Sequence, residues 1–242
     1  MTANPLMSTA YYAIGSGSNG CSDTISTVVS VNPVPILNTF PSNTDICMGD
    51  TISLFVEGAL SYIWNPSTGL NSVNTDTVQA SPLSNIVYSV LGIDSLGCTS
   101  SSSISVNVNN LPNIDVTSVD SKICLGESTF LTATGGVQYN WDPSNSLSSN
   151  TGSVVSASPI TNTSYIVTGI DINSCSSWDT ISVIVNPLPI LSINSLNSTI
   201  CEGESTPLIV SGATTYVWSP SLGLNTSIGN SVIANPFNST NY

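Results

Sequence analysis

The sequence predicts an all-β protein, organised as a tandem array of small β-sandwiches with an exact 77-residue period. Three observations lead to this fold class. Short runs of alternating apolar and polar residues are bounded by Gly, Pro, Asn and Ser, as expected for strands separated by turns. No segment of 11 or more residues shows helical periodicity. The whole pattern also recurs in constant register along the chain.

The repeat is visible as identical residues at intervals of 77 positions, without insertion or deletion. The recurring sets are Cys21, Cys98 and Cys175; Cys47, Cys124 and Cys201; Tyr62, Tyr139 and Tyr216; Trp64, Trp141 and Trp218; and Tyr11, Tyr88, Tyr165 and Tyr242. A period of this length is too long for a solenoid turn or a propeller blade. It fits a β-sandwich module that has its own core.

Short proline-bearing segments mark the module boundaries, because proline fixes φ and lacks a backbone donor. We expect the C-terminal part of a module in residues 1–34, complete modules in 35–111 and 112–188, and the N-terminal part of a module in 189–242. The short linkers predict a semi-rigid rod. Two interpretations of the partial modules stay open: a window on a longer array, or a filament subunit whose half-modules complete each other between chains by strand complementation.

Within one repeat, the expected strands are residues 52–56, 62–64, 77–80, 87–90 and 104–108. Gly58 ends the first of these strands, and the pair Asn65-Pro66 ends the second. Ser81-Pro82 forms a turn before the fourth, and the segment from Gly92 to Gly97 turns the chain into the last. These spacings are typical of a β-sandwich.

The recurring aromatic residues are predicted to be core residues of an immunoglobulin-like sandwich. Trp64, Trp141 and Trp218 lie where that fold places its core indole, and Tyr88, Tyr165 and Tyr242 begin the penultimate strand, as a tyrosine corner does. Trp178 breaks the repeat, because Ser101 and Thr24 occupy the equivalent positions. It is the candidate interface residue.

Composition excludes several functional classes. The chain has 14 acidic residues, one basic residue (Lys122) and no histidine, for a formal charge of −13. It therefore cannot neutralise a row of phosphates in a nucleic acid or bind anionic lipid through a basic patch. It also lacks the base of the common catalytic triads. No apolar run is long enough to span a bilayer, so we expect no direct membrane insertion. We also expect no enzymatic activity.

Each 77-residue repeat carries a combined motif, and the successive copies of this motif cover the whole chain. The motif is Ile46-Cys47-x-Gly49, Gly58, Tyr62-x-Trp64-x-Pro66, Gly69-Leu70, Ser81-Pro82, Tyr88-x-Val90-x-Gly92-x-Asp94 and Gly97-Cys98. It resembles the immunoglobulin-like or PKD-like repeats of very long cell-surface adhesins of Bacteroidota, including gliding-motility-associated proteins exported by type IX secretion. The second complete repeat departs from the motif, with Ser146 in place of Gly69 and Ser174 in place of Gly97. These departures leave the turn geometry open.

The resemblance implies an extracellular, cell-surface location and a role as an adhesin stalk or filament. It supplies no catalytic residues. An Asp-(Ser/Thr)-apolar pattern is similar to the O-glycosylation acceptor motif of Bacteroidota surface proteins, although hydroxyl residues are abundant enough for chance matches. The candidate glycosylation sites are Thr24, Thr51, Thr77, Ser95 and Thr180.

Six cysteines predict disulfides formed in an oxidising compartment. The simplest pairing lies within repeats, as Cys47–Cys98 and Cys124–Cys175. Immunoglobulin topology places Cys47 and Cys98 at opposite ends of a module, however, so pairing between adjacent modules, such as Cys47–Cys175, is the alternative. A third scheme joins Cys21–Cys47, Cys98–Cys124 and Cys175–Cys201, and free thiols remain open as well.

The carboxylates indicate turns rather than a metal site. Asp94 and Asp171 recur in a hairpin turn, and Asp50, Glu127 and Glu204 precede a strand. Because Ca²⁺ needs six to eight converging oxygens, we expect no cofactor, with structural calcium at a junction as a minor alternative. The expected partners are neighbouring repeats or identical filament subunits, and surface polysaccharide if the modules bind carbohydrate. Besides the recurring tryptophans and the tyrosine-corner residues, the only recurrent candidates for a sugar-binding platform are Tyr62, Tyr139 and Tyr216. Alternation places Tyr62 on the same sheet face as Trp64, which favours a core position for it.

Overall fold

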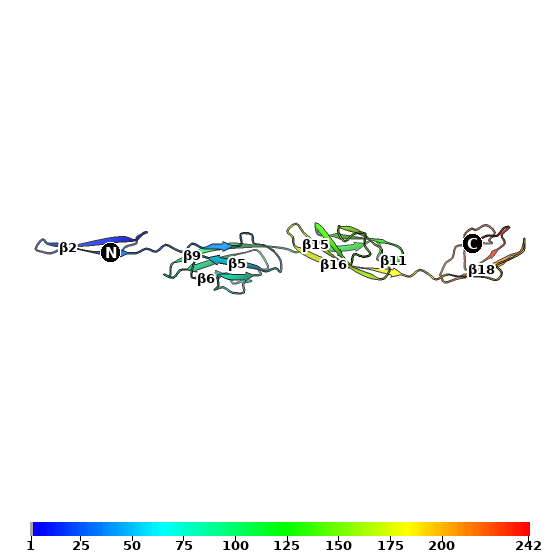
Figure 1. Cartoon of the computed structure of the whole chain (residues 1–242), viewed down its shortest axis with the longest axis horizontal. Helices are drawn as coiled ribbons and strands as arrows, with labels where there is room; N and C mark the ends of the chain where they lie inside the picture. The colour runs from blue at the N-terminus through cyan, green and yellow to red at the C-terminus, as the bar shows by residue number, and fades with distance from the viewer. Residues whose placement is uncertain (1) are drawn as a thin grey trace.

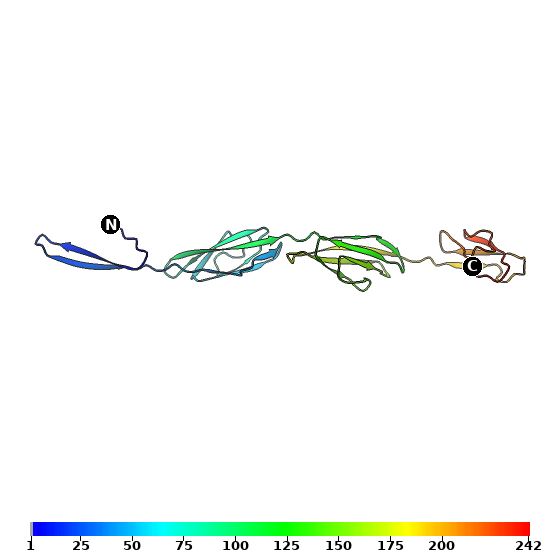
Figure 2. The ribbon, with the colours of Figure 1, turned by 90° about the horizontal axis from the view of Figure 1, so that it is seen from above.

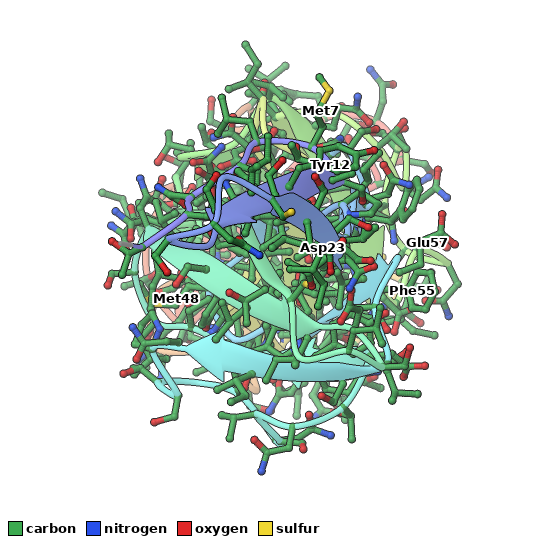
Figure 3. The ribbon with its side chains drawn as sticks, turned by 90° about the vertical axis from the view of Figure 1, so that its left-hand side faces the viewer. Met7, Tyr12, Asp23, Met48, Phe55 and Glu57 are labelled. Carbon is green, nitrogen blue, oxygen red and sulfur yellow. A yellow bond between two sulfur atoms is a disulfide. The ribbon has the colours of Figure 1, made fainter. Side chains whose placement is uncertain are left out.

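The computed structural model describes residues 2–242 and shows four β units in a row along one axis (Figures 1 and 2). Viewed from the N-terminal end, the units lie one behind another, with the hairpin that carries Tyr12 and Asp23 nearest the viewer (Figure 3). Every regular element of the described residues is a β-strand. This confirms the predicted all-β fold class. In the same residues there is no helix with the length and apolar character to cross a membrane.

The first unit is a single antiparallel hairpin of β1 (Thr9–Ser16) and β2 (Ser22–Val29). Its register runs from Thr9 opposite Val29 to Ser16 opposite Ser22. Both faces of the hairpin are largely exposed. The unit is therefore two strands without a second sheet to cover them.

The second unit, within residues 35–111, is a complete two-layer sandwich. Its strands are β3 (Asn38–Phe40), β4 (Asp45–Cys47), β5 (Ile52–Glu57), β6 (Ser61–Asn65), β7 (Thr77–Ala80), β8 (Ile86–Ile93) and β9 (Thr99–Asn109). One sheet has the order β3-β5-β7 and the other β4-β9-β8-β6. Only the β4–β9 pair is parallel among these. This arrangement is that of an immunoglobulin-like sandwich.

The third unit, within residues 112–188, repeats this architecture. Its strands are β10 (Asp115–Ser118), β11 (Lys122–Cys124), β12 (Thr129–Thr134), β13 (Gln138–Asp142), β14 (Val154–Ala157), β15 (Thr163–Ile170) and β16 (Ser176–Asn186). The sheets are β10-β12-β14 and β11-β16-β15-β13. The registers are also equivalent, since Ser61 opposite Ile93 recurs as Gln138 opposite Ile170.

The fourth unit is one three-stranded sheet of β17 (Ser192–Ser195), β18 (Thr206–Ser211) and β19 (Ser231–Ala234). The described residues at the positions of β4 and β6, 199–201 and 215–219, are not strands here. In a complete unit those strands pair with β9 and β8. Without these partners their backbone groups have no ladder to join.

Each complete unit has its own core. Leu54, Val56, Val90 and Val106 form part of one fully buried cluster, and Leu131, Val155, Val167 and Val183 belong to the equivalent cluster of the next unit. Each such side chain contributes about 1.5–3 kcal/mol when it is fully buried. None of the clusters among the described residues spans a junction. The modules are therefore stabilised separately.

Candidate functional site at the module junction

The junction between the two complete modules is closed by a disulfide between Cys47 and Cys175. The two Cα atoms are 5.5 Å apart, although 128 positions separate the residues along the chain. Cys47 belongs to the module of residues 35–111 and Cys175 to the module of residues 112–188. The bond is thus a covalent link between modules, additional to the polypeptide.

Topology places Cys47 at the end of its module that faces the next one. It is the last residue of β4 and lies opposite Asn109, the last residue of β9, in a parallel pair. The Asp50 carboxylate accepts a hydrogen bond from the Cys47 amide at 3.2 Å, and the Asp50 amide donates to the Cys47 carbonyl at 3.0 Å. Gly49 has a φ of 96°, a conformation that glycine adopts without steric cost. This turn fixes the direction of the cysteine.

The same turn recurs after Cys124 and Cys201. The carboxylate of Glu127 accepts from the Cys124 amide at 2.9 Å, and that of Glu204 accepts from the Cys201 amide at 3.1 Å. The acidic residues that precede β5, β12 and β18 therefore order these cysteine turns. They make the local backbone bonds expected of turn carboxylates.

Cys175 lies in the turn between β15 and β16, at the opposite end of a module. One Asp171 carboxylate oxygen accepts hydrogen bonds from the amides of Asn173 at 2.9 Å and of Cys175 at 2.8 Å. Asp94 holds the equivalent turn of Cys98 in the same way, at 2.8 Å from the Cys98 amide. Ser174 has a φ of 66° where the other complete module has Gly97 at 83°. The turn geometry is kept despite the substitution.

The within-repeat pairing that the sequence favoured is wrong for this structure, since neither Cys47–Cys98 nor Cys124–Cys175 forms. The physical reason is that each module carries one cysteine beside the end of its last strand and the other in the turn that precedes that strand. The two cysteines of one module therefore face different neighbours. The third scheme, with Cys21–Cys47, Cys98–Cys124 and Cys175–Cys201, does not form either. Cys21, Cys98, Cys124 and Cys201 are free, and all except Cys98 are exposed.

A second covalent link changes the mechanics of the junction. If the linker at Leu111-Pro112 were the only covalent connection, one module could bend and rotate relative to the other about this single segment of polypeptide. Two attachment points oppose both motions. In the chain-entropy model, a disulfide that closes a loop of 128 residues stabilises the folded state by about 5 kcal/mol.

The recurring tryptophans lie in the cores. Trp64, Trp141 and Trp218 are 2%, 1% and 6% exposed. Their indole nitrogens donate to the carbonyls of Thr75, Gly152 and Gly229, each at 2.9 Å. Trp178, in contrast, is 66% exposed and stands on β16 opposite Thr168.

The second set of aromatic residues connects a strand start to a distant loop. Tyr88 and Tyr165 are fully buried, whereas Tyr242 is half-buried. The Tyr88 hydroxyl donates to the Thr68 carbonyl at 2.6 Å, and Tyr242 donates to the Leu222 carbonyl at 3.0 Å. The Tyr165 hydroxyl instead bonds the Ser146 hydroxyl at 2.6 Å. Burial raises the pKa of Tyr88.

The candidate sugar platform is used internally. The hydroxyls of Tyr62, Tyr139 and Tyr216 donate to the carbonyls three residues before them, at 2.9, 2.7 and 2.5 Å. Tyr62 itself is 8% exposed. These rings therefore support a turn and do not form a flat exposed surface.

The candidate glycosylation residues are all exposed: Thr24, Thr51, Thr77, Ser95 and Thr180. Asp23 and Asp179 bond the amides of the threonines that follow them, each at 2.8 Å. Within residues 2–242, no group of three or more Cys, Asp or Glu side chains is arranged to hold a metal ion.

No protein-family model and no curated protein matches the chain. Among solved structures, it is similar to the N-terminal eight Ig domains of Down Syndrome Cell Adhesion Molecule, with 13% identity, a TM-score of 0.47, and coverage of 94% of this chain and 36% of that one. It is also similar to titin domains I67–I69, with 12% identity, a TM-score of 0.42, and coverage of 85% and 89%.

A third similar structure is a Ca²⁺-stabilized adhesin with which an Antarctic bacterium binds ice, at 13% identity and a TM-score of 0.40, covering 94% of this chain and 74% of that one. The chain spans about a third of the length of the first of these structures. At such identities and TM-scores, the fold assignment rests on the strand order and register of this chain. Its function has to be argued from its own residues.

Proposed function

We propose that this chain is a structural or adhesive extracellular protein without enzymatic activity, which forms a semi-rigid surface filament or adhesin stalk. The observation that supports this proposal best is the Cys47–Cys175 bond between modules that lie in a row (Figure 1). A bond that joins two separately folded cores adds no packing contact to either core. It restricts how the modules move relative to each other, as a stalk requires.

The bond also changes the path of a pulling force. Tension that enters at Pro35 reaches Cys47 through β3 and β4, crosses to Cys175, and leaves through β16. Most residues of both modules lie outside this covalent path. The stalk would therefore resist lengthening even when its modules unfold.

Composition supports an extracellular location. Disulfides persist in oxidising environments and are rare in the cytosol. Only 6% of the residues are charged, and nearly all of those charges are negative, which opposes the collapse of parallel rods onto each other. On the basis of the motif resemblance, the proposal also includes export by type IX secretion and a link to gliding motility. It further includes O-glycans at the exposed candidate threonines and at Ser95. Intact-mass spectrometry that finds no hexose increments on the protein would contradict the proposed O-glycosylation.

A carbohydrate-binding array is the weaker alternative. It needs an exposed aromatic surface that repeats with the module, but Tyr62 and its equivalents bond their own turns and Trp178 has no aromatic equivalent. Binding of the chain to a glycan array, lost on the change Trp178→Ala, would favour this alternative. Silence of the array would dismiss it.

Small-angle X-ray scattering tests the rod. The 11-residue strands β9 and β16 give each unit a length of about 36 Å, so four units span roughly 140 Å and have a radius of gyration of about 40 Å, against about 18 Å for a compact globule of this chain length. The oxidised chain should give the larger value. A radius of gyration near that of the globule would contradict the proposal.

A further inference from the structure

One row of side chains on the outer face of the third unit differs from its equivalents elsewhere in the chain. Asn140 on β13 lies opposite Thr168 on β15, and Thr168 lies opposite Trp178 on β16. Alternation turns these side chains away from the core, because the adjacent residues Trp141 and Val167 are the ones that are buried. We call Asn140, Thr168 and Trp178 the outer row.

In the other copies of the repeat, the equivalent positions carry two aliphatic side chains and a hydroxyl. In the second unit, Ile63 lies opposite Leu91, and Leu91 lies opposite Ser101, in the same register as the outer row. Two hydrogen-bonding groups thus replace an aliphatic pair in the outer row, and an aromatic ring replaces a hydroxyl. The equivalents in the sequence are Ile63 and Val217 for Asn140, Ile14 and Leu91 for Thr168, and Thr24 and Ser101 for Trp178.

The core of the module does not require this exchange. The buried neighbours Trp141 and Val167 have identical equivalents in the second unit, Trp64 and Val90. The strand order of the two units is also the same. Trp178 is 66% exposed, so most of its ring contacts solvent and not the module. Three facing positions that change together, without a reason in the core, indicate a ligand on this face.

The surface around the outer row combines apolar and polar groups. In the adjacent row, Ile166 lies between Asp142 and Thr180, and it is 43% exposed. Diagonal neighbours in a sheet are about 7–8 Å apart, so Ile166 extends the apolar surface beside the indole of Trp178. Adjacent strands are about 4.8 Å apart, so the three residues of the outer row span about 10 Å.

We propose that this surface binds a glycosyl residue of a neutral polysaccharide. A sugar ring has C–H groups on its faces and hydroxyls around its edge. The C–H face packs on the indole of Trp178, whose π-system is negative on its face. The sugar hydroxyls bond the Thr168 hydroxyl and the Asn140 amide, which supplies both donors and an acceptor. The aliphatic pair of the second unit has no such groups.

The charges on the module favour a neutral sugar over an acidic one. Asp142 is the carboxylate that lies beside the outer row on this face, and it repels anionic ligands. The Asp179 carboxylate is already bonded to two backbone amides. The only basic residue, Lys122, lies opposite Ile184, which is six positions along β16 from Trp178, or about 20 Å. The site therefore has no positive charge to pair with a uronic acid or a sulfate.

A protein partner fits this face less well. The centre of a protein interface is more apolar than the rest of the surface, and a stable interface covers about 800 Å² on each partner. The outer row has instead exchanged two aliphatic side chains for an amide and a hydroxyl. A sugar, which is small and bears hydroxyls, uses both kinds of group.

The site goes beyond the proposed stalk, because it gives one module a ligand of its own. It also differs from a carbohydrate-binding array, in which every module binds, since the outer row is not repeated in the chain. Scattering from the protein without polysaccharide tests the rod. Failure of sugar binding and failure of the proposed stalk therefore give different results.

Native affinity electrophoresis of the whole oxidised chain tests the proposal. The formal charge of −13 moves the folded protein toward the anode. The gels contain mannan, dextran or laminarin as neutral probes, and alginate as an acidic probe. We expect retardation in at least one neutral gel and none in alginate. Retardation in no neutral gel, or equal retardation in alginate, would overturn the proposal.

Two exposed aromatic residues of the same module provide a matched pair of variants. Trp178→Ala removes the ring of the outer row and should weaken binding about tenfold or more. Phe130→Ala removes a ring that is 56% exposed on β12, in the other sheet, and should leave binding unchanged. Unchanged binding in Trp178→Ala, or an equal loss in both variants, would overturn the proposal.

A double variant separates a sugar site from general apolar adhesion. Asn140→Ile with Thr168→Leu introduces the residues of the second unit and keeps Trp178. It should lose binding about tenfold, because two hydrogen-bonding groups are removed, and Asn140→Ala alone should show a smaller loss. An unchanged melting temperature verifies that these surface variants fold. Equal or stronger binding by the double variant would overturn the proposal and favour an apolar partner.

Discussion

Cys47 and Cys175 are 128 positions apart along the chain, yet their Cα atoms lie 5.5 Å from each other across a module junction. Cys47 ends β4 beside the exit of one module, and Cys175 lies in the hairpin turn of the next module that faces back toward it. Both cysteines are held by turns in which a carboxylate bonds the cysteine amide. Local hydrogen bonds, independent of the disulfide, therefore order the turns that carry the two cysteines.

The first prediction concerns extension under force. The bond removes 128 positions from the load path, so at ~3.5 Å per residue the fully stretched oxidised chain should be shorter than the reduced chain by roughly 450 Å. Single-molecule stretching measures this difference. Cys47→Ser should give the reduced length without reductant, whereas Cys98→Ser, a free cysteine, should behave as the unmodified chain. Equal contour lengths for the oxidised and reduced chains would refute the load path.

The second prediction compares two tryptophans in one module. Trp141→Phe removes an indole that is 1% exposed, together with its hydrogen bond to Gly152. We expect the module of residues 112–188 to lose about 2–3 kcal/mol of unfolding free energy. Trp178→Phe, at an exposed site, should change it by less than about 0.5 kcal/mol. Guanidinium unfolding of both variants checks this, and similar losses would show that Trp178 is also a packing residue.

The third prediction concerns alkaline pH. Burial raises the pKa of Tyr88, because the phenolate would lose its hydration. The unfolded chain can then ionise this residue more easily than the folded chain. The stabilising contribution is complete below the ordinary tyrosine pKa of about 10 and is lost as pH rises toward the raised value.

Tyr88→Phe provides the test of this pH dependence. The variant should lose about 1 kcal/mol at neutral pH with the bond to Thr68, and its stability should fall less steeply above pH ~10 than that of the unmodified chain. Thermal unfolding between neutral and alkaline pH measures both effects. Tyr12→Phe, at a side chain that is 70% exposed, is the control. A slope identical to that of the unmodified chain would exclude Tyr88 as the group responsible.

The fourth prediction concerns backbone strain at Ser174. Its φ of 66° lies in the left-handed region, which costs a residue with a side chain about 1 kcal/mol more than glycine. Ser174→Gly should therefore raise the melting temperature of its module and stabilise it by about 0.5–1 kcal/mol. The reverse change in the other module, Gly97→Ser, should destabilise it by a similar amount. Calorimetry on both variants decides the matter, and a loss of stability in Ser174→Gly would contradict the strain argument.

Much of the fold could be predicted from alternation and repetition. The strand expected at residues 52–56 is found as Ile52–Glu57, and the one at 62–64 lies within Ser61–Asn65. The strands β3 and β4 were not predicted, because three residues are too few for alternation to show. The 77-residue repeat of the sequence predicted that the two complete modules have the same architecture.

The junction was less predictable. Spacing alone cannot distinguish Cys47–Cys98 from Cys47–Cys175, because both pairings respect the repeat. Only the positions of the two cysteines at opposite ends of a module decide between them, and these depend on strand order. The bond between Tyr165 and Ser146 was likewise hidden, since it replaces a carbonyl acceptor with a hydroxyl at one repeat only.

The central claim, a covalent bond across the junction, is tested most directly by tryptic cleavage after the only basic residue, Lys122. The chain is alkylated under oxidising conditions, denatured without reductant and digested with trypsin. The Cys47–Cys175 bond should hold residues 1–122 and 123–242 together until reductant is added, and Cys98→Ser should behave the same way. Separation of the two halves without reductant would contradict the account, because Cys47–Cys98 and Cys124–Cys175 each lie on one side of the cut.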